Sequence, residues 1–245
     1  MHRRTRFAAT ALASASLLFA AACEGGGKAA SAGAPAKAPA DAPAKAPATL
    51  TADQAKSVLL TAADLSAGWK FEKDTVIDSG DAASYEFGPA KPTTCKAIVD
   101  LVNTGRLLSD YKINRQAVFT DASGGSHILQ DVSGYESAAD AEQAVTALAA
   151  TVKACGSFKS TFEGKTALAK AEVFEIPALG EQSTGLRVQI KNDVHAVDQD
   201  IAVIRVGAAI STVHNNWGDG QRGEKDFDRA IHKVETSLKA TKPTS

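Results

Sequence analysis

The three cysteines of this 245-residue chain are the residues whose positions point most directly to chemistry. Cys23 directly follows Ala20, Ala21 and Ala22, at the end of a short apolar stretch. A thiol after small residues at such a place is typical of a bacterial lipobox, although lipoboxes usually carry Leu where Ala20 stands. There the cysteine receives a diacylglycerol and the preceding residues are removed. We predict that Cys23 is lipidated, with a plain secretory peptide cut after Ala-x-Ala as the alternative.

Cys95 and Cys155 remain once Cys23 is assigned to the lipid. An exported domain lies in an oxidising compartment, and the remaining number of cysteines is even, so we predict a Cys95–Cys155 disulfide. It would close a loop of about sixty residues and stabilise the fold by roughly 4 kcal/mol on the chain-entropy model. The alternative is a free catalytic thiol assisted by a histidine.

Polar clusters elsewhere could hold a metal or perform acid–base chemistry. Asp193, His195, Asp198 and Asp200 are close in sequence, but alternation along an extended chain would point Asp198 away from Asp193 and His195, so we interpret the stretch as a polar hairpin. Residues 215–221 have the oxygen content of a calcium loop without its spacing or its closing Glu, which favours a turn between a strand and a helix.

No recognised catalytic motif is present: the chain contains no G-x-S-x-G elbow, no HExxH and no P-loop. His127, His214 and His232 are scattered, and we expect each to be a strand or surface residue rather than a base. We therefore predict no catalytic residue, no metal and no cofactor. An unrecognised hydrolase is the remaining enzymatic alternative.

Two tryptophans are the candidates for ligand binding. Trp69 and Trp217 both adjoin glycines in stretches that we expect to be loops, where an accessible indole can line a cleft. We predict that any cleft includes Trp217 and the loop around it. Ordinary core packing is the alternative for each indole.

The segments before the folded domain determine where it works. Residues 1–22 combine Arg3, Arg4 and Arg6 with an uncharged stretch too short to span a bilayer, which predicts an export signal. Residues 23–49 are rich in Ala, Pro and Lys and repeat an octapeptide, which predicts a disordered, semi-rigid tether. No run of eighteen apolar residues occurs in the chain.

Residues 50–245 have the composition of one folded domain. They carry 21 Lys and Arg against 26 Asp and Glu, a net charge of −5, which disfavours nucleic acid as a partner. Apolar stripes and capping residues predict helices from Thr51, at 61–65, 94–105, 138–154 and 224–239.

The alternating segment 186–190 predicts a strand with one wet face, and 201–206 predicts a central strand buried on both faces. Gly207, between the apolar segments 201–206 and 208–213, suggests a bulge or a close backbone approach. Weaker strand patterns are found at 116–121, 126–133, 157–163 and 168–176. The sequence therefore predicts an α+β domain, with an antiparallel sheet and flanking helices.

Several segments together are similar to a known family. The stretch from Leu59 to Trp69, Cys95 followed by Ile98 and Leu101, and the motifs 154–158, 178–183 and 204–207 resemble the PknH-like extracellular sensor domain. The resemblance covers about residues 55–240. It implies an antiparallel sheet with flanking helices and a cleft for a ligand, without established chemistry. Kinase members carry two disulfides, whereas this chain has cysteines for one and no kinase domain.

These observations predict a lipid-anchored binding or sensor-type domain on the outer face of the cytoplasmic membrane. Its expected partners are the membrane, through the lipid on Cys23, and a small-molecule or cell-envelope ligand in a cleft. The alternative in another class is an envelope scaffold that binds a protein partner through a sheet edge or a helix face.

Overall fold

The computed structural model describes residues 49–72, 87–107, 110–217 and 223–241. The expected signal peptide and tether, including Cys23, lie outside the described residues. No helix of the described part is long and apolar enough to cross a membrane.

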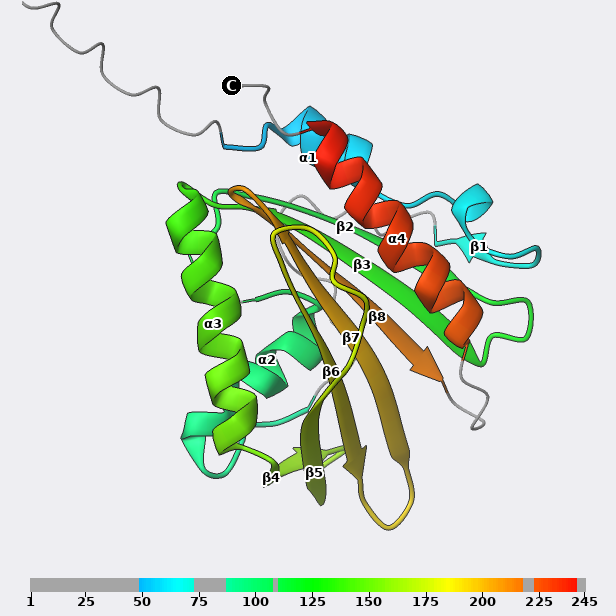
Figure 1. Cartoon of the computed structure of the whole chain (residues 1–245). Helices are drawn as coiled ribbons and strands as arrows, with labels where there is room; N and C mark the ends of the chain where they lie inside the picture. Colours follow the sequence, from blue (N-terminus) through cyan, green and yellow to red (C-terminus); the bar gives the residue numbers. More distant parts are fainter. Residues whose placement is uncertain (1–48, 73–86, 108–109, 218–222, 242–245) are drawn as a thin grey trace, which may run out of the picture. The chain divides into compact units, whose positions relative to one another are not determined.

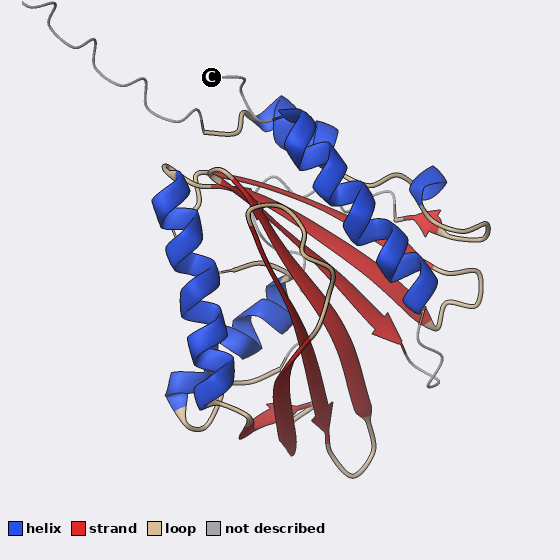
Figure 2. Cartoon of the chain, in the orientation of Figure 1, coloured by secondary structure: helices blue, strands red, loops and turns tan. Residues whose placement is uncertain are grey.

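A single sheet of eight strands organises the described chain (Figures 1 and 2). Every neighbouring pair is antiparallel, and the spatial order is β1-β2-β3-β8-β7-β6-β5-β4. The strands are β1 (Lys70–Phe71), β2 (Ile113–Thr120), β3 (Ser126–Gly134), β4 (Ser157–Phe162), β5 (Lys165–Phe174), β6 (Gln182–Lys191), β7 (Ala196–Val206) and β8 (Ala209–Trp217).

Most strands follow their partner through a short connection. The exceptions are β1 with β2, which residues 72–112 separate, and the central pair of β3 with β8. The helix α3 carries the chain from β3 to β4 at one edge of the sheet, and the hairpins β4 to β8 then return to β3 (Figure 1). This topology confirms the expected antiparallel α+β class.

The helices begin and end where the sequence provides capping residues. Thr51 forms a complete capping box with Gln54 at the start of α1 (Ala52–Val58), and the Ser137 side chain accepts from the amide of Asp140 at the start of α3 (Ala138–Ala154). Gly105, with φ 75°, ends α2 (Lys96–Thr104) in the left-handed conformation that favours glycine. The remaining helical elements are η1 (Ala62–Asp64), η2 (Thr93–Cys95) and α4 (Glu224–Thr241).

The sheet separates two hydrophobic cores, one beneath α2 and α3 and the other beneath α1 and α4. Strand β7 contributes to both, because Ile201 and Val203 belong to the first core and Ala202 and Ile204 to the second. A strand buried on both faces therefore runs through the middle of the sheet, as the apolar run at 201–206 predicts. We call these two sides the α3 face and the α4 face.

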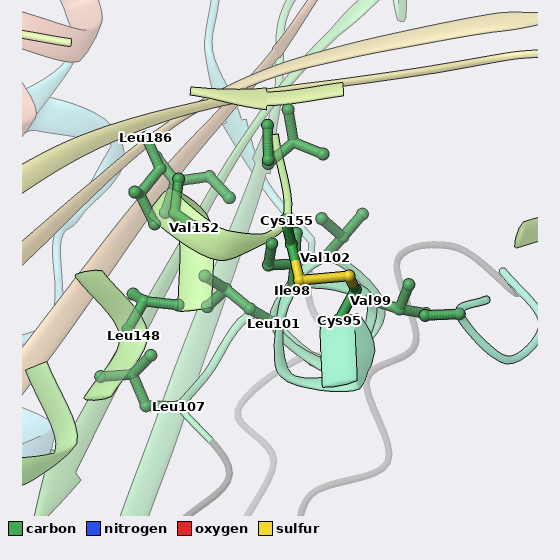
Figure 3. Close-up of a cluster of buried hydrophobic side chains, with 14 of the residues drawn as sticks. Cys95, Ile98, Val99, Leu101, Val102, Leu107, Leu148, Val152, Cys155 and Leu186 are labelled. Atoms are coloured by element: carbon green, nitrogen blue, oxygen red, sulfur yellow. A yellow bond between two sulfur atoms is a disulfide. The ribbon is translucent and has the colours of Figure 1, made fainter. Parts of the chain in front are cut away.

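The disulfide lies in the core of the α3 face. Cys95 immediately precedes α2 and Cys155 immediately follows α3, so the predicted Cys95–Cys155 bond joins the start of one helix to the end of the other. Figure 3 shows the bridge among aliphatic side chains of both helices and of β6. Both cysteines are buried, with at most 2% of their surface exposed.

One expectation about the strands was wrong. Gly207 does not form a bulge within a strand; it lies with Ala208 in the turn between β7 and β8. Its φ of 58° is the left-handed value that tight two-residue hairpin turns require. Because the strands on both sides of the turn are apolar, residues 201–213 resemble a single interrupted strand in the sequence.

Candidate functional site

Trp69 lies in the segment before β1, as expected of a loop residue, and it is half-buried against the core of the α4 face. Its indole Nε1 donates a hydrogen bond of 2.9 Å to Asp226 Oδ2 on α4. The backbone amide of Ser66 donates to the other oxygen of the same carboxylate. Burial acts to raise the pKa of Asp226, but these hydrogen bonds outweigh it and lower the pKa below its usual value.

Trp217 is the last residue of β8 rather than part of a loop, and only 7% of its surface is exposed. Its cross-strand partners are Ser126 of β3 and Asp198 of β7. The side chain therefore belongs to the α4 face. The loop expected to complete a cleft with Trp217 falls at 218–222, outside the described residues.

The clustered aspartates and His195 form the polar hairpin that the sequence predicts. Asn192 closes the turn, because its side-chain oxygen accepts from the amides of Val194 and His195. Asp200 forms a bidentate ion pair with Arg187, and Asp198 accepts from Gln189. In the described part of the chain no three His, Cys, Asp or Glu side chains come together to hold a metal ion.

The polar residues that do converge are others, and they lie on the α3 face beside the end of α2. We call them the inner polar array. Each of these residues has more than nine-tenths of its surface buried, and on neighbouring strands they occupy every second position, so that their side chains point to the same face. The inner polar array consists of Asn114 and Gln116 of β2, Asp131 and Ser133 of β3, Thr212, His214 and Asn216 of β8, and Gln199 of β7.

Asp131 is at the centre of this array and is completely enclosed. Its carboxylate accepts hydrogen bonds from Asn114 at 2.6 Å, from Gln116 at 2.9 Å and from Ser133 at 2.7 Å. Burial raises the pKa of Asp131 to about 6, while these donors and the charge of Arg106 oppose the rise. Asp131 thus has enough donors to remain an anion at neutral pH.

The last carbonyls of α2 and of its cap residue, which lack a partner within the helix, bind the other half of the array. Gly105 O accepts from the Thr212 hydroxyl and lies 3.0 Å from His214 Nε2, and Thr104 O accepts from Gln116. Burial lowers the pKa of His214 to about 4, against the effect of its bond to Gly105. His214 is therefore neutral at physiological pH, with its proton on Nε2 because that nitrogen faces a carbonyl.

Three amide groups of the array are not fully satisfied. Gln116 Oε1, Gln199 Nε2 and Asn216 Oδ1 are buried and have no hydrogen-bond partner among the described residues. An unpaired buried polar atom costs about 1–3 kcal/mol, so each needs an explanation. Gln199 and Asn216 are direct cross-strand partners, which places two of the three side by side.

The array can recognise a molecule through hydrogen bonds but has no arrangement for nucleophilic catalysis. The described contacts of His214 are a carbonyl and an amide, so it does not face a nucleophile. The Ser133 hydroxyl donates its hydrogen bond to Asp131 rather than to a histidine. Sequence reasoning missed these residues, apart from His214 as a strand residue. Polar side chains at alternate positions of 114–116, 131–133 and 212–216 are the pattern that could have indicated them.

Fold and site together define an antiparallel α+β domain with helices on both faces of the sheet and a buried polar array on one of them. This is the fold of the extracellular domain of PknH from Mycobacterium tuberculosis, with a TM-score of 0.60 at 13% sequence identity. The match covers 79% of this chain and 98% of that one. The predicted PknH-like sensor-domain fold is thus confirmed.

An uncharacterized protein from Mycobacterium smegmatis, a Rv0999 ortholog, also matches, with 15% identity over 78% of this chain and 98% of that chain. Its TM-score is 0.45. No protein-family model and no curated protein matches this chain.

Proposed function

We propose that this chain is a lipid-anchored, extracytoplasmic binding or sensor-type domain whose small ligand contacts the inner polar array. The observation that carries the proposal is the presence of buried amide groups without partners in an otherwise satisfied network. Natural proteins satisfy nearly all of their buried polar atoms, and binding sites are a recognised exception. The fold supports the proposal because a solved protein with this fold is an extracellular domain.

Two features support the proposed location, namely the residues that precede the sheet and the disulfide. The signal-like segment and Cys23 support export and anchoring to the outer face of the cytoplasmic membrane. The buried Cys95–Cys155 bond supports an oxidising compartment. The membrane is then a partner through the lipid, and the tether separates the domain from it.

A scaffold that binds a protein partner has less support. The exposed large apolar side chains of the described part are Phe71, Leu168, Val173 and Val194. Phe71 is in β1 and Val194 is in the turn between β6 and β7. Leu168 and Val173 share β5 but point to opposite faces of it, because their positions differ by an odd number. Among the described residues these side chains therefore do not gather into one patch that could receive a partner.

Native mass spectrometry of the mature protein, extracted from membranes of an expressing bacterium, tests the proposal. We expect an additional mass of a small molecule that disappears on unfolding and is absent from the Gln199→Met variant. Gln189→Met, an exposed change on the opposite face of the sheet, is the matched control and should retain the mass. A protein that carries no small molecule and gains none when incubated with a cell-envelope extract would contradict the proposal.

A further inference from the structure

We propose that the cross-strand pair Gln199 and Asn216 is the ligand-contacting part of the inner polar array, and that it takes an uncharged, hydroxyl-rich molecule such as a polyol or a sugar. The inference rests on the proposed function and deepens it by naming the contact residues and the ligand class. Gln199 is 1% exposed and Asn216 is 4% exposed, and each has an amide atom without a partner.

The orientation of the Gln199 amide follows from His214. Gln199 Oε1 lies 3.5 Å from His214 Nδ1. His214 carries its proton on Nε2, so Nδ1 is an acceptor and cannot bond to another acceptor. Rotation of the amide by 180°, which leaves its shape unchanged, brings its NH2 group to Nδ1. The unpaired atom of Gln199 is then an oxygen.

Asn216 presents a second oxygen beside the first. Directly opposed residues of an antiparallel pair have Cβ atoms about 4.5–5.5 Å apart, and Gln199 and Asn216 are such a pair. Elsewhere in the array Gln116, two strands from Asn216 and offset from it by four residues along the register, has a third unpaired oxygen. The array therefore offers hydrogen-bond acceptors in excess of its donors, which suits a molecule that brings O–H or N–H groups.

The charges of the array select against an ionic ligand. Asp131 already accepts three hydrogen bonds and is near the charge of Arg106, so little of its acceptor capacity and of its charge remains for a buried cation. An anion would face unpaired oxygens and a neutral His214. Hydroxyl groups satisfy amide oxygens without the cost of burying a charge. A neutral polyol or sugar is thus the class that fits.

Isothermal titration of the mature domain with four probes tests the inference: myo-inositol and glucose as uncharged polyols, putrescine as a cation and inorganic phosphate as an anion. We expect binding of an uncharged probe, weakened at least about tenfold by Gln199→Met and by Asn216→Leu and unchanged by Gln189→Met. Asn216→Leu removes an unsatisfied buried amide, so its melting temperature should not fall, which separates lost binding from lost folding. Gln199→Met also removes the bond to His214 Nδ1, so its folded state is verified by circular dichroism before titration. If native mass spectra of the parent protein show a retained molecule, that molecule is identified and then sought in the same variants. A neutral, hydroxyl-rich molecule that is present in the parent and absent from Gln199→Met would equally support the inference.

The remaining outcomes each overturn the inference in a distinguishable way. Binding or retention of a charged molecule that depends on Gln199 overturns the ligand class and leaves the proposed function standing. Binding that is equal in the parent and in both array variants overturns the contact residues alone. A protein that binds no probe and carries no molecule overturns the inference together with the proposed function.

Discussion

Asp131 and His214 lie diagonally across the central β3–β8 pair, since Asp131 is the register partner of Thr212 and His214 is two residues further along β8. Burial moves their pKa values in opposite directions, to about 6 for Asp131 and about 4 for His214. Relative to the unfolded chain, burial favours the uncharged form of each group, and the two pKa shifts affect stability over nearly the same pH range.

The opposing shifts predict a flat stability profile between pH 4 and pH 6. The native state binds the Asp131 proton more tightly than the unfolded state does, so this group lowers stability as the pH rises from about 4 to 6. The native state binds the His214 proton more weakly, so that group raises stability as the pH rises from about 4 to 6.5. The two slopes cancel.

In Asp131→Asn the effect of His214 should no longer be cancelled, so the free energy of unfolding should rise by about 3 kcal/mol from pH 4 to 6.5. In His214→Gln the effect of Asp131 should remain alone, so the free energy of unfolding should fall as the pH rises. Denaturant unfolding at a series of pH values measures both, and the slope is informative even if each variant is less stable overall. Asp193→Asn, at an exposed carboxylate, is the control. Identical slopes in all variants would contradict the prediction.

Gly180→Ala should be among the most destabilising single changes in the chain. Gly180 has φ 65°, and a Cβ at this position would lie 2.4 Å from the backbone oxygen of Arg205. Gly164 shares the left-handed conformation, with φ 74°, but has no neighbour within 4 Å. We expect Gly164→Ala to cost about 1–2 kcal/mol from backbone strain alone and Gly180→Ala clearly more. Equal losses in thermal or denaturant unfolding would show that the close approach is unimportant.

Removal of the disulfide should weaken the fold. Cys95 and Cys155 are separated by 60 residues, and the chain-entropy model gives about 4 kcal/mol for a loop of this length. The double Cys→Ala variant should show this loss in denaturant unfolding, whereas reducing agent should leave the stability of that variant unchanged. A parent protein whose stability is insensitive to reduction would refute the prediction.

Asp226→Asn should destabilise the chain by about 1 kcal/mol at pH 7, because the charged acceptor of the Trp69 and Ser66 hydrogen bonds is replaced. The folded-state pKa of Asp226 is lowered, so its contribution is present above the unfolded value near 4 and is lost as the pH falls through the folded value. The difference between parent and variant should therefore shrink below pH 4. Asp228→Asn, exposed on the same helix, should leave stability nearly unchanged.

Cys23→Ser tests the lipid anchor. We expect the parent protein to fractionate with membranes and the variant to appear in the soluble fraction, because one serine hydroxyl cannot receive the thioether-linked lipid. Mass spectrometry of the mature N-terminus provides the second measurement. Equal membrane partition of the two proteins would contradict the assignment.

The elements that could be predicted are those with local signals. The bounds 138–154 match α3 because Ser137 caps the helix and Val145, Leu148 and Val152 recur on one face. The left-handed Gly105 ends α2 where the sequence predicts. Such features depend on neighbours within a few residues, so a single sequence contains them.

The inner polar array could not be predicted because it depends on register. Gln116, Asp131 and Thr212 become neighbours only through the pairing of β2 with β3 and of β3 with β8. The second pairing joins Asp131 to Thr212, which is 81 residues further along the chain. Polar residues at buried positions also weaken the alternation that identifies a strand. The glycine that follows Trp217 favours a loop at this position, but β8 includes Trp217 as its last residue.

The two faces of the sheet have a consequence for any optical study of this protein. The chain contains only two tryptophans, and both Trp69 and Trp217 belong to the α4 face. The disulfide and the inner polar array belong to the other face. Intrinsic tryptophan fluorescence therefore reports directly on the α4 face alone. Ligand binding at Gln199, or reduction of the disulfide beneath α3, would leave the emission spectrum unchanged unless it altered the structure of the α4 face.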